Sequence, residues 1–98
     1  MTVESLTPLA ETDLLEQVKI ALKMEGNNYN DNTILIWIKD VKDDLLFAGV
    51  SADVVGSTLA VGCITHGVED KWANPRPDHS DLYYQGVERL RSIKVKEV

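Results

Sequence analysis

Apolar side chains recur every three or four residues along most of this chain, and this spacing constrains the fold more than any other feature of the sequence. Between residues 31 and 48 one stripe advances by four, three, four and three residues, through Ile34, Ile38, Val41, Leu45 and Ala48. A repeat near 3.6 residues is typical of a helix with one buried face, whereas a strand alternates with a period of two. The spacing therefore predicts an all-α protein.

The apolar pattern and the residues that interrupt it predict four helices. Gly26 and Gly49 follow the first two, because glycine readily adopts the left-handed conformation that closes a helix. The run Asn74-Pro75-Arg76-Pro77 ends the third, since proline lacks an amide hydrogen and restricts the residue before it. Thr12 and Ser51 are the expected N-caps of the first and third helices. We expect a compact bundle of four helices, over about residues 13–24, 31–48, 52–73 and 80–91, with an extended C-terminal tail.

The third predicted helix, residues 52–73, is expected to lie at the centre of the bundle. Between Asp53 and His66 its only ionisable side chain is the thiol of Cys63. Small residues also recur along it at steps of four, three and four, at Gly56, Ala60, Cys63 and Gly67. Such a stripe lets another part of the chain approach the helix closely, so tight packing should offset the low helix propensity of glycine.

The length of the chain suits one domain, so residues 1–98 are expected to form a single helical domain. Residues 1–11 are expected to be a flexible leader. The segment from Ile93 to Val98 alternates apolar and polar residues, which favours an extended strand. No partner strand is predicted inside the domain, so we expect residues 92–98 to become ordered on another chain.

Charge is distributed unevenly along the sequence. Residues 1–55 carry ten acidic and four basic side chains, whereas residues 56–98 carry six of each. The net charge of −6 disfavours non-specific binding to nucleic acid, which is itself a polyanion. The uneven distribution predicts an acidic front and a basic C-terminal end that complement each other between molecules.

The sequence does not support a secreted or membrane-spanning protein. No basic cap followed by an apolar segment begins the chain, and the longest uncharged run, Val54 to Thr65, is too short to cross a bilayer. Cys63 is the single cysteine, so no disulfide can form within the chain. These observations favour the cytoplasm.

Candidate chemical groups are few. Cys63, His66 and Asp70 share one stripe of the third predicted helix, but metal sites usually draw ligands from more than one element. Cys63 lies in an apolar stretch, where a thiol is a poor nucleophile. The glycines do not form a phosphate-binding loop. We therefore expect no catalytic residue, metal or cofactor, and no enzyme activity.

The segment around Gly49 allows an alternative function, a small helix-turn-helix DNA-binding regulator. Ala48-Gly49-Val50-Ser51 resembles the turn of such repressors, in which the next helix enters the major groove. The start of that next helix would need Arg, Lys, Gln or Asn to read DNA, yet no cation occurs from Phe47 to Asp70. Chemistry therefore favours a helical hairpin with a similar turn.

The order of elements from Thr12 to Arg91 resembles the small head-tail connector proteins of long-tailed bacteriophages. The resemblance lies in a short helix ending in Leu22-Lys23-Met24, an Asn/Asp loop, the Ile34-Leu35-Ile36-Trp37-Ile38 helix and an apolar third helix. Trp72-Ala73-Asn74-Pro75-Arg76 and a helix bearing tyrosines complete it. It implies a virion assembly protein: an adaptor, or head-completion protein, that forms an oligomeric ring below the portal and joins the DNA-filled capsid to the next connector or tail.

The resemblance also implies partners and locations. The ring commonly has twelve subunits, and its partners would be further copies of the chain, the portal protein and a downstream connector or tail protein. Genome DNA would pass through the lumen without sequence-specific binding, and no membrane would be involved. The protein would reside in the virion, at the head-tail connection, after assembly in the host cytoplasm.

Two groups of residues are candidates for these contacts. For the subunit interface the candidates are Trp37, Leu46 and Phe47, because aromatic residues are enriched at interface centres, although Trp37 fits a place in the core equally well. For a C-terminal tail that binds the portal or another partner, the candidates are Arg89, Arg91, Ile93, Lys94, Val95, Lys96 and Val98.

Overall fold

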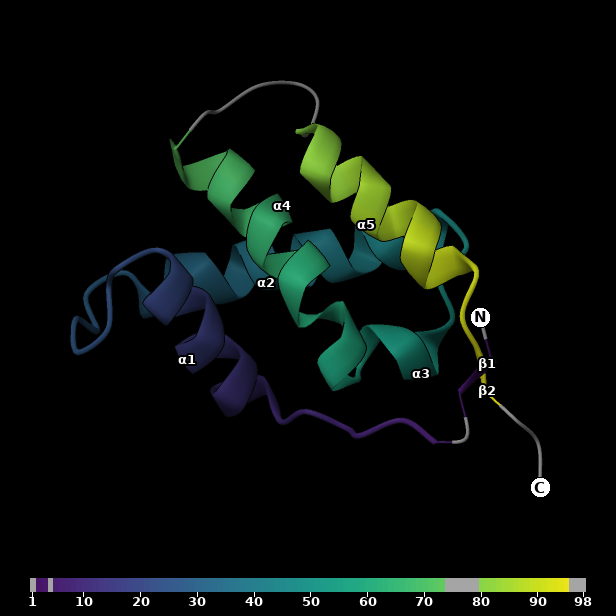
Figure 1. Cartoon of the computed structure of the whole chain (residues 1–98). Helices are drawn as coiled ribbons and strands as arrows, with labels where there is room; N and C mark the ends of the chain where they lie inside the picture. Colours follow the sequence, from purple (N-terminus) through teal and green to yellow (C-terminus); the bar gives the residue numbers. More distant parts are fainter. Residues whose placement is uncertain (1, 4, 74–79, 96–98) are drawn as a thin grey trace.

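The computed structural model describes residues 2, 3, 5–73 and 80–95, and most of these are helical (Figure 1). In chain order the elements are strand β1 (Thr2–Val3), helices α1 (Glu11–Ala21), α2 (Asp31–Phe47) and α3 (Ala52–Val55), the 3₁₀ helix η1 (Thr58–Ala60), helices α4 (Val61–Ala73) and α5 (Asp81–Arg91), and strand β2 (Lys94–Val95). Helix α4 lies between α1 and α5 and in front of α2, and it contacts all three (Figure 1). The predicted all-α bundle is confirmed.

The apolar stripe predicted for the second helix is part of the core, and the last helix contributes a stripe of its own. On α2, Ile34, Ile38, Val41 and Leu45 are fully buried and Ala48 is half-buried. On α5 the buried residues are Tyr83, Val87 and Leu90. Each stripe follows the 3.6-residue repeat, so one face of each helix is removed from water while the opposite face stays exposed.

The third helix predicted over residues 52–73 is interrupted, and this corrects the expectation. Ser57 adopts an extended backbone conformation between α3 and η1. Its buried hydroxyl donates to the carbonyl of Val54 at 2.7 Å and accepts from the amide of Leu59 at 3.3 Å. A serine that bonds to nearby backbone groups competes with the helix. The polypeptide therefore ends one short helix and begins another at this residue.

Backbone hydrogen bonds hold the N-terminal segment, which was expected to be a flexible leader. The amide of Leu9 donates to the carbonyl of Gly56 at 3.0 Å, and the amide of Thr58 donates to the carbonyl of Thr7 at 2.9 Å. Pro8 also forms an isolated bridge with Ser57. The break in the third helix thus exposes backbone groups that residues 7–9 satisfy.

The C-terminal tail is extended, as predicted, but it pairs within the chain. Strand β2 lies parallel to β1, with Thr2 opposite Lys94 and Val3 opposite Val95. Ile93 is buried in the core. The expectation that the tail finds its partner only on another molecule is therefore wrong for residues 93–95. Lys96 to Val98 lie outside the described residues.

Two of the expected helix ends are confirmed. Gly49, with φ of +99°, follows α2, and the Ser51 hydroxyl caps α3 by accepting from the amide of Val54 at 3.3 Å. The first helix instead begins at Glu11 behind Ala10, not at Asp13 behind Thr12, and ends at Ala21. The left-handed residue nearest its end is Lys23. The Pro75-Arg76-Pro77 elbow lies outside the described residues.

Small residues bring the helices together. A Cβ atom on Gly67 would lie 2.8 Å from a Val41 methyl carbon and 3.0 Å from the ring of Tyr83. A Cβ atom on Gly86 would lie 3.0 Å from the Cys63 sulfur. Helix α4 therefore packs against α2 at Gly67, as its small-residue stripe predicts, and α5 packs against α4 through a glycine of its own.

Candidate functional site

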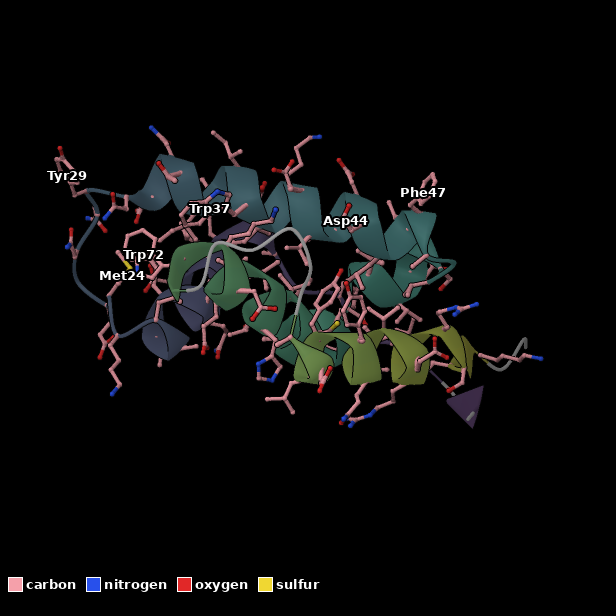
Figure 2. All side chains as sticks on the ribbon, turned by 90° about the horizontal axis from the view of Figure 1, so that it is seen from above. Met24, Tyr29, Trp37, Asp44, Phe47 and Trp72 are labelled. Atoms are coloured by element: carbon pink, nitrogen blue, oxygen red, sulfur yellow. The ribbon has the colours of Figure 1, made fainter. Side chains whose placement is uncertain are left out.

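The C-terminal end of α2 presents apolar side chains to solvent. Because Leu45 faces the core, the next two residues are rotated away from it, and Phe47 is 96% exposed while Leu46 is 44% exposed. Figure 2 shows Phe47 at one end of α2, pointing away from the body of the protein. Phe47 and Leu46 are adjacent exposed apolar residues, and aromatic residues are enriched at interface centres, so this end of α2 is a candidate contact with another molecule.

Three carboxylates lie near this end of α2, and Arg91 of α5 approaches it at Gly49. Helical spacing puts the exposed residues Asp40 and Asp43 on the same face as Phe47, seven and four residues before it. Asp44 lies one turn back on the adjacent face (Figure 2). Asp43 forms an exposed ion pair with Lys39 at 3.1 Å. The last turn carries no basic residue to offset the negative end of the helix dipole. The predicted acidic front therefore includes the surroundings of Phe47.

Trp37, the third interface candidate, packs within the chain. Its ring lies 5.5 Å from that of Trp72, centre to centre, in an edge-to-face arrangement. Figure 2 shows this pair toward the end of α2 opposite to Phe47. Trp37 is half-buried, whereas Trp72 is exposed. Of the three candidates, the structure places Leu46 and Phe47 at one exposed site and Trp37 elsewhere.

A groove of about 160 Å³ lies between α4 and α5. It is open at Gly62, where no atom lies within 4 Å of an added Cβ, and Leu59 and Leu82 form exposed apolar walls. The nine lining residues are Leu59, Gly62, Cys63, His66, Leu82, Gln85, Gly86, Arg89 and Leu90. Among these lining residues Arg89 is the cation and none carries a carboxylate. The groove therefore suits an apolar group with acidic neighbours.

Cys63 lies in this groove but is a poor nucleophile. Its thiol donates to the carbonyl of Tyr83 at 3.6 Å. Burial raises the pKa of the Cys63 thiol to about 11, and Arg89 lowers it only in part. The thiol is thus almost entirely protonated at neutral pH, and the reactive thiolate is scarce.

Asp70, which shares a stripe with Cys63 and His66, has a structural role. Its carboxylate accepts hydrogen bonds from the amide of Ser80 at 2.9 Å and from the Ser80 hydroxyl at 3.0 Å. These bonds connect α4 to the start of α5. Among the described residues no group of three or more histidine, cysteine or carboxylate side chains is arranged to hold a metal ion.

A second, shallower pocket of about 410 Å³ separates α2 from α5. Carboxylates of Asp44 and Glu88 line it together with Tyr84 and Arg91. Glu88 and Arg91 are 2.9 Å apart and form an ion pair. This pocket adjoins the end of α2 and, unlike the α4–α5 groove, carries acidic groups.

The candidates for the partner-binding tail are dispersed. Arg89 lines the α4–α5 groove, and Arg91 borders the pocket on the other side of α5. Ile93 is in the core, and Lys94 and Val95 belong to β2. Lys96 and Val98 lie outside the described residues. The structure thus leaves Arg89, Arg91 and Lys94 as exposed cations on the described part of this segment.

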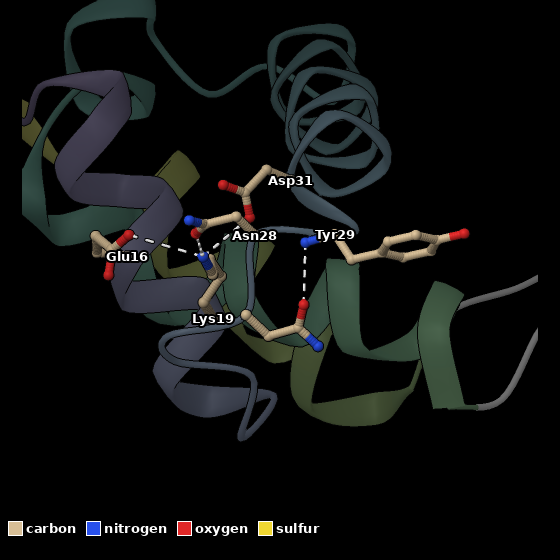
Figure 3. Close-up of polar contacts among 6 residues, drawn as sticks. Glu16, Lys19, Asn28, Tyr29 and Asp31 are labelled. Atoms are coloured by element: carbon tan, nitrogen blue, oxygen red, sulfur yellow. Dashed lines mark hydrogen bonds and ion pairs between the residues drawn. The ribbon is translucent and has the colours of Figure 1, made fainter.

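Lys19 forms a buried polar cluster that sequence reasoning missed. Its side chain is 1% exposed, and its Nζ lies 2.9 Å from Asp31 Oδ1 and 3.9 Å from Glu16 Oε1. It donates to Asn28 Oδ1 at 2.9 Å (Figure 3). The cluster ties α1 to the loop and to the first turn of α2. Tyr29 in that loop is 90% exposed.

Sequence reasoning also missed the α4–α5 groove. The relevant signal is a pair of glycines on two adjacent helices, Gly62 and Gly86, flanked by leucines. That signal becomes a groove only when the pairing of the two helices is known. The cluster at Lys19 likewise depends on how the Asn/Asp loop folds back toward α1.

The turn between α2 and α3 does not lead to a recognition helix. Helix α3 contains only four residues, and its exposed side chains are those of Ala52 and Asp53. A helix of one turn with a leading carboxylate is poorly suited to the major groove of DNA. The geometry therefore gives no support to the DNA-binding alternative.

No helix among the described residues is both long enough and apolar enough to cross a membrane. Comparisons of the chain with protein-family models, curated proteins and solved structures find no match. The functional argument therefore depends on the exposed end of α2, the α4–α5 groove and the charges around them.

Proposed function

We propose that this chain is a structural adaptor of virion assembly: a head-tail connector that forms a ring below the portal and joins the filled capsid to the next connector or tail. The observation that carries the proposal is Phe47, an almost fully exposed aromatic side chain at the C-terminal end of helix α2. Buried aromatic anchors contribute much of the affinity of protein interfaces. An exposed anchor of this kind supports a role in assembly.

Unlike faces support a ring. A ring is built from heterologous contacts, in which one patch meets a different patch on the next subunit. The outer face of α2 is acidic around Phe47, whereas Arg89 lies on α5. Opposite charges on two separate faces favour head-to-tail contacts and disfavour contacts between identical faces.

The remaining partners follow from the same proposal. The exposed cations Arg91 and Lys94 are candidates for the portal contact, because a portal that offers carboxylates would attract them. Carboxylates that line the lumen of the ring would repel passing DNA and keep it mobile. Buried Ile93 is no longer a candidate for direct contact.

The test is to mix the purified chain with the portal protein of the same genome and to measure the mass of the products by light scattering after gel filtration. The proposal expects a discrete complex that contains a fixed number of chains on each portal ring. A chain that remains monomeric and elutes separately from the portal would refute it. Titration with duplex DNA at low salt is the control, and it should show no complex.

A further inference from the structure

We infer that Phe47 of one copy inserts into the α4–α5 groove of the next copy, and that this contact sets the direction of assembly. The inference rests on the proposed function, because it assigns the two surfaces through which the subunits of the ring meet. It joins an anchor and a receptor that the structure places on different faces of the chain.

The sizes of the two surfaces agree. The groove has a volume of about 160 Å³ and apolar walls formed by Leu59 and Leu82. An apolar cavity of about 150 Å³ binds benzene, so the groove can hold a phenyl ring. Leu90 and the protonated thiol of Cys63 also line the groove, and His66, Gln85 and Arg89 add polar surface, so an inserted ring would contact apolar and polar atoms together. The most exposed hydrophobic side chain of the described residues is therefore matched by a groove of suitable volume.

The charges of the two surfaces also agree. Arg89 lines the groove, and none of the lining residues carries a carboxylate. On the side of the anchor, Asp40 and Asp43 precede Phe47 on the outer face of α2. Asp43 also forms an ion pair with Lys39. Insertion of Phe47 would bring this acidic face and the negative end of the α2 dipole toward Arg89.

The pocket between α2 and α5 is the less suitable receptor. Asp44 and Glu88 line it, so the acidic surroundings of Phe47 would meet carboxylates there. Its lining includes Ala48, the residue that follows Phe47, and a contact between two such nearby surfaces favours a closed pair with twofold symmetry over a ring. Charge and position thus both favour the α4–α5 groove.

Helical spacing fixes the relation between anchor and receptor. On α5, Leu82 and Arg89 lie on the side that faces the groove, seven residues apart. Glu88 and Arg91 lie on the opposite side, toward α2. Helix α2 and its Phe47 are therefore separated from the groove by α5. Contacts between such faces are head to tail and repeat from one subunit to the next.

Two complementary variants test the inference. Phe47→Asp removes the anchor and leaves the groove intact, and Leu82→Arg blocks the groove and leaves the anchor intact. Both positions are exposed, so the fold should be retained, which circular dichroism and thermal unfolding will verify. Each variant alone should self-associate about 10- to 100-fold more weakly than the wild type, the loss expected for one buried aromatic anchor. An equimolar mixture should form a one-to-one heterodimer, because only one intact contact can form.

Sedimentation velocity of the wild type, the two variants and their mixture provides the measurement. Tyr29→Asp is the matched control, since Tyr29 is a similarly exposed aromatic at the other end of α2, and it should associate like the wild type (Figure 2). The inference is overturned if Phe47→Asp associates like the wild type, if the mixture remains monomeric, or if the wild type does not associate at about 1 mM, where even weak contacts form. Portal-bound rings formed by Phe47→Asp would reject this contact and leave the proposed function standing. A heterodimer in the mixture, together with no complex between the wild type and the portal, would support this contact and reject the proposed function.

Discussion

Removing the acceptor of the buried lysine should destabilise the protein more than removing the lysine itself. The Nζ atom of Lys19 is almost completely buried and lies 2.9 Å from Asp31, whose side chain is 27% exposed. Asp31→Ala would leave a buried ammonium with Asn28 and the more distant, exposed Glu16. Breaking a fully buried pair in this way costs about 3–5 kcal/mol. Partial exposure of Asp31 and the remaining bond to Asn28 reduce the expected cost to about 2–4 kcal/mol.

Lys19→Met removes the buried charge and preserves an apolar chain of similar shape. The exposed amide of Asn28 can then bind water, whereas the buried Oδ1 atom of Asp31 loses its ion-pair partner. The free energy of unfolding should therefore fall by about 1–2 kcal/mol, which is less than for Asp31→Ala. In the double variant Lys19→Met/Asp31→Ala no buried charge is left, so most of the cost of Asp31→Ala should disappear, giving a coupling energy of about 1–3 kcal/mol.

Urea unfolding followed by tryptophan fluorescence measures these differences, with Trp37 and Trp72 as reporters. The midpoint should shift while the slope against urea stays constant, which shows that stability alone has changed. Equal destabilisation by the two single variants, or additive effects in the double variant, would show that the cluster does not behave as a buried ion pair.

Three further predictions concern the helical core. Gly67→Ala should reduce the free energy of unfolding by about 1–3 kcal/mol, because the added Cβ would overlap Val41. Gly62→Ala should raise the free energy of unfolding by about 0.5–1 kcal/mol, because there is open space around Gly62. Thermal melts that give the two variants equal stability would contradict this packing. Cys63 should react slowly with a thiol reagent at neutral pH and rapidly in urea, and fast labelling of the folded protein would contradict its burial. The pKa of the Cys63 thiol rises from 9.0 to about 11 on folding. The contribution of this thiol to the free energy of unfolding should therefore be fully present below pH 9. It should be lost, by up to about 2 kcal/mol, as the pH rises through 11. Buried Tyr83, whose pKa is also raised, contributes to the same decline. Cys63→Ala should therefore make the loss of stability between pH 9 and pH 11 smaller without abolishing it. A dependence of stability on pH that is the same in Cys63→Ala and the wild type would show that the Cys63 thiol does not cause the decline.

The fold could be predicted from the sequence wherever one helix determines its own pattern. The buried stripe of α2 follows from apolar spacing alone, and the end at Gly49 follows from the conformational freedom of glycine. The break at Ser57 could not be predicted in this way. It depends on hydrogen bonds to residues 7–9, which are remote in sequence and were not expected to be ordered.

In the candidate site, too, the residues that depend on one helix could be predicted from the sequence, and those that depend on remote contacts could not. Phe47 could be selected from the sequence because it lies off the buried stripe at a helix end. Trp37 could not be assigned, because its partner Trp72 is on another helix. The pairing of residues 94–95 with residues 2–3 brings together the two ends of the described chain, and no local pattern predicts it.

The number of chains bound to one portal ring tests the central claim most directly, and native mass spectrometry of the mixed proteins measures it. A single product with one fixed integer of chains on each portal ring is the predicted result. Masses that correspond only to the free portal and the single chain, at every ratio of the two proteins, would contradict the claim that this protein assembles into a connector.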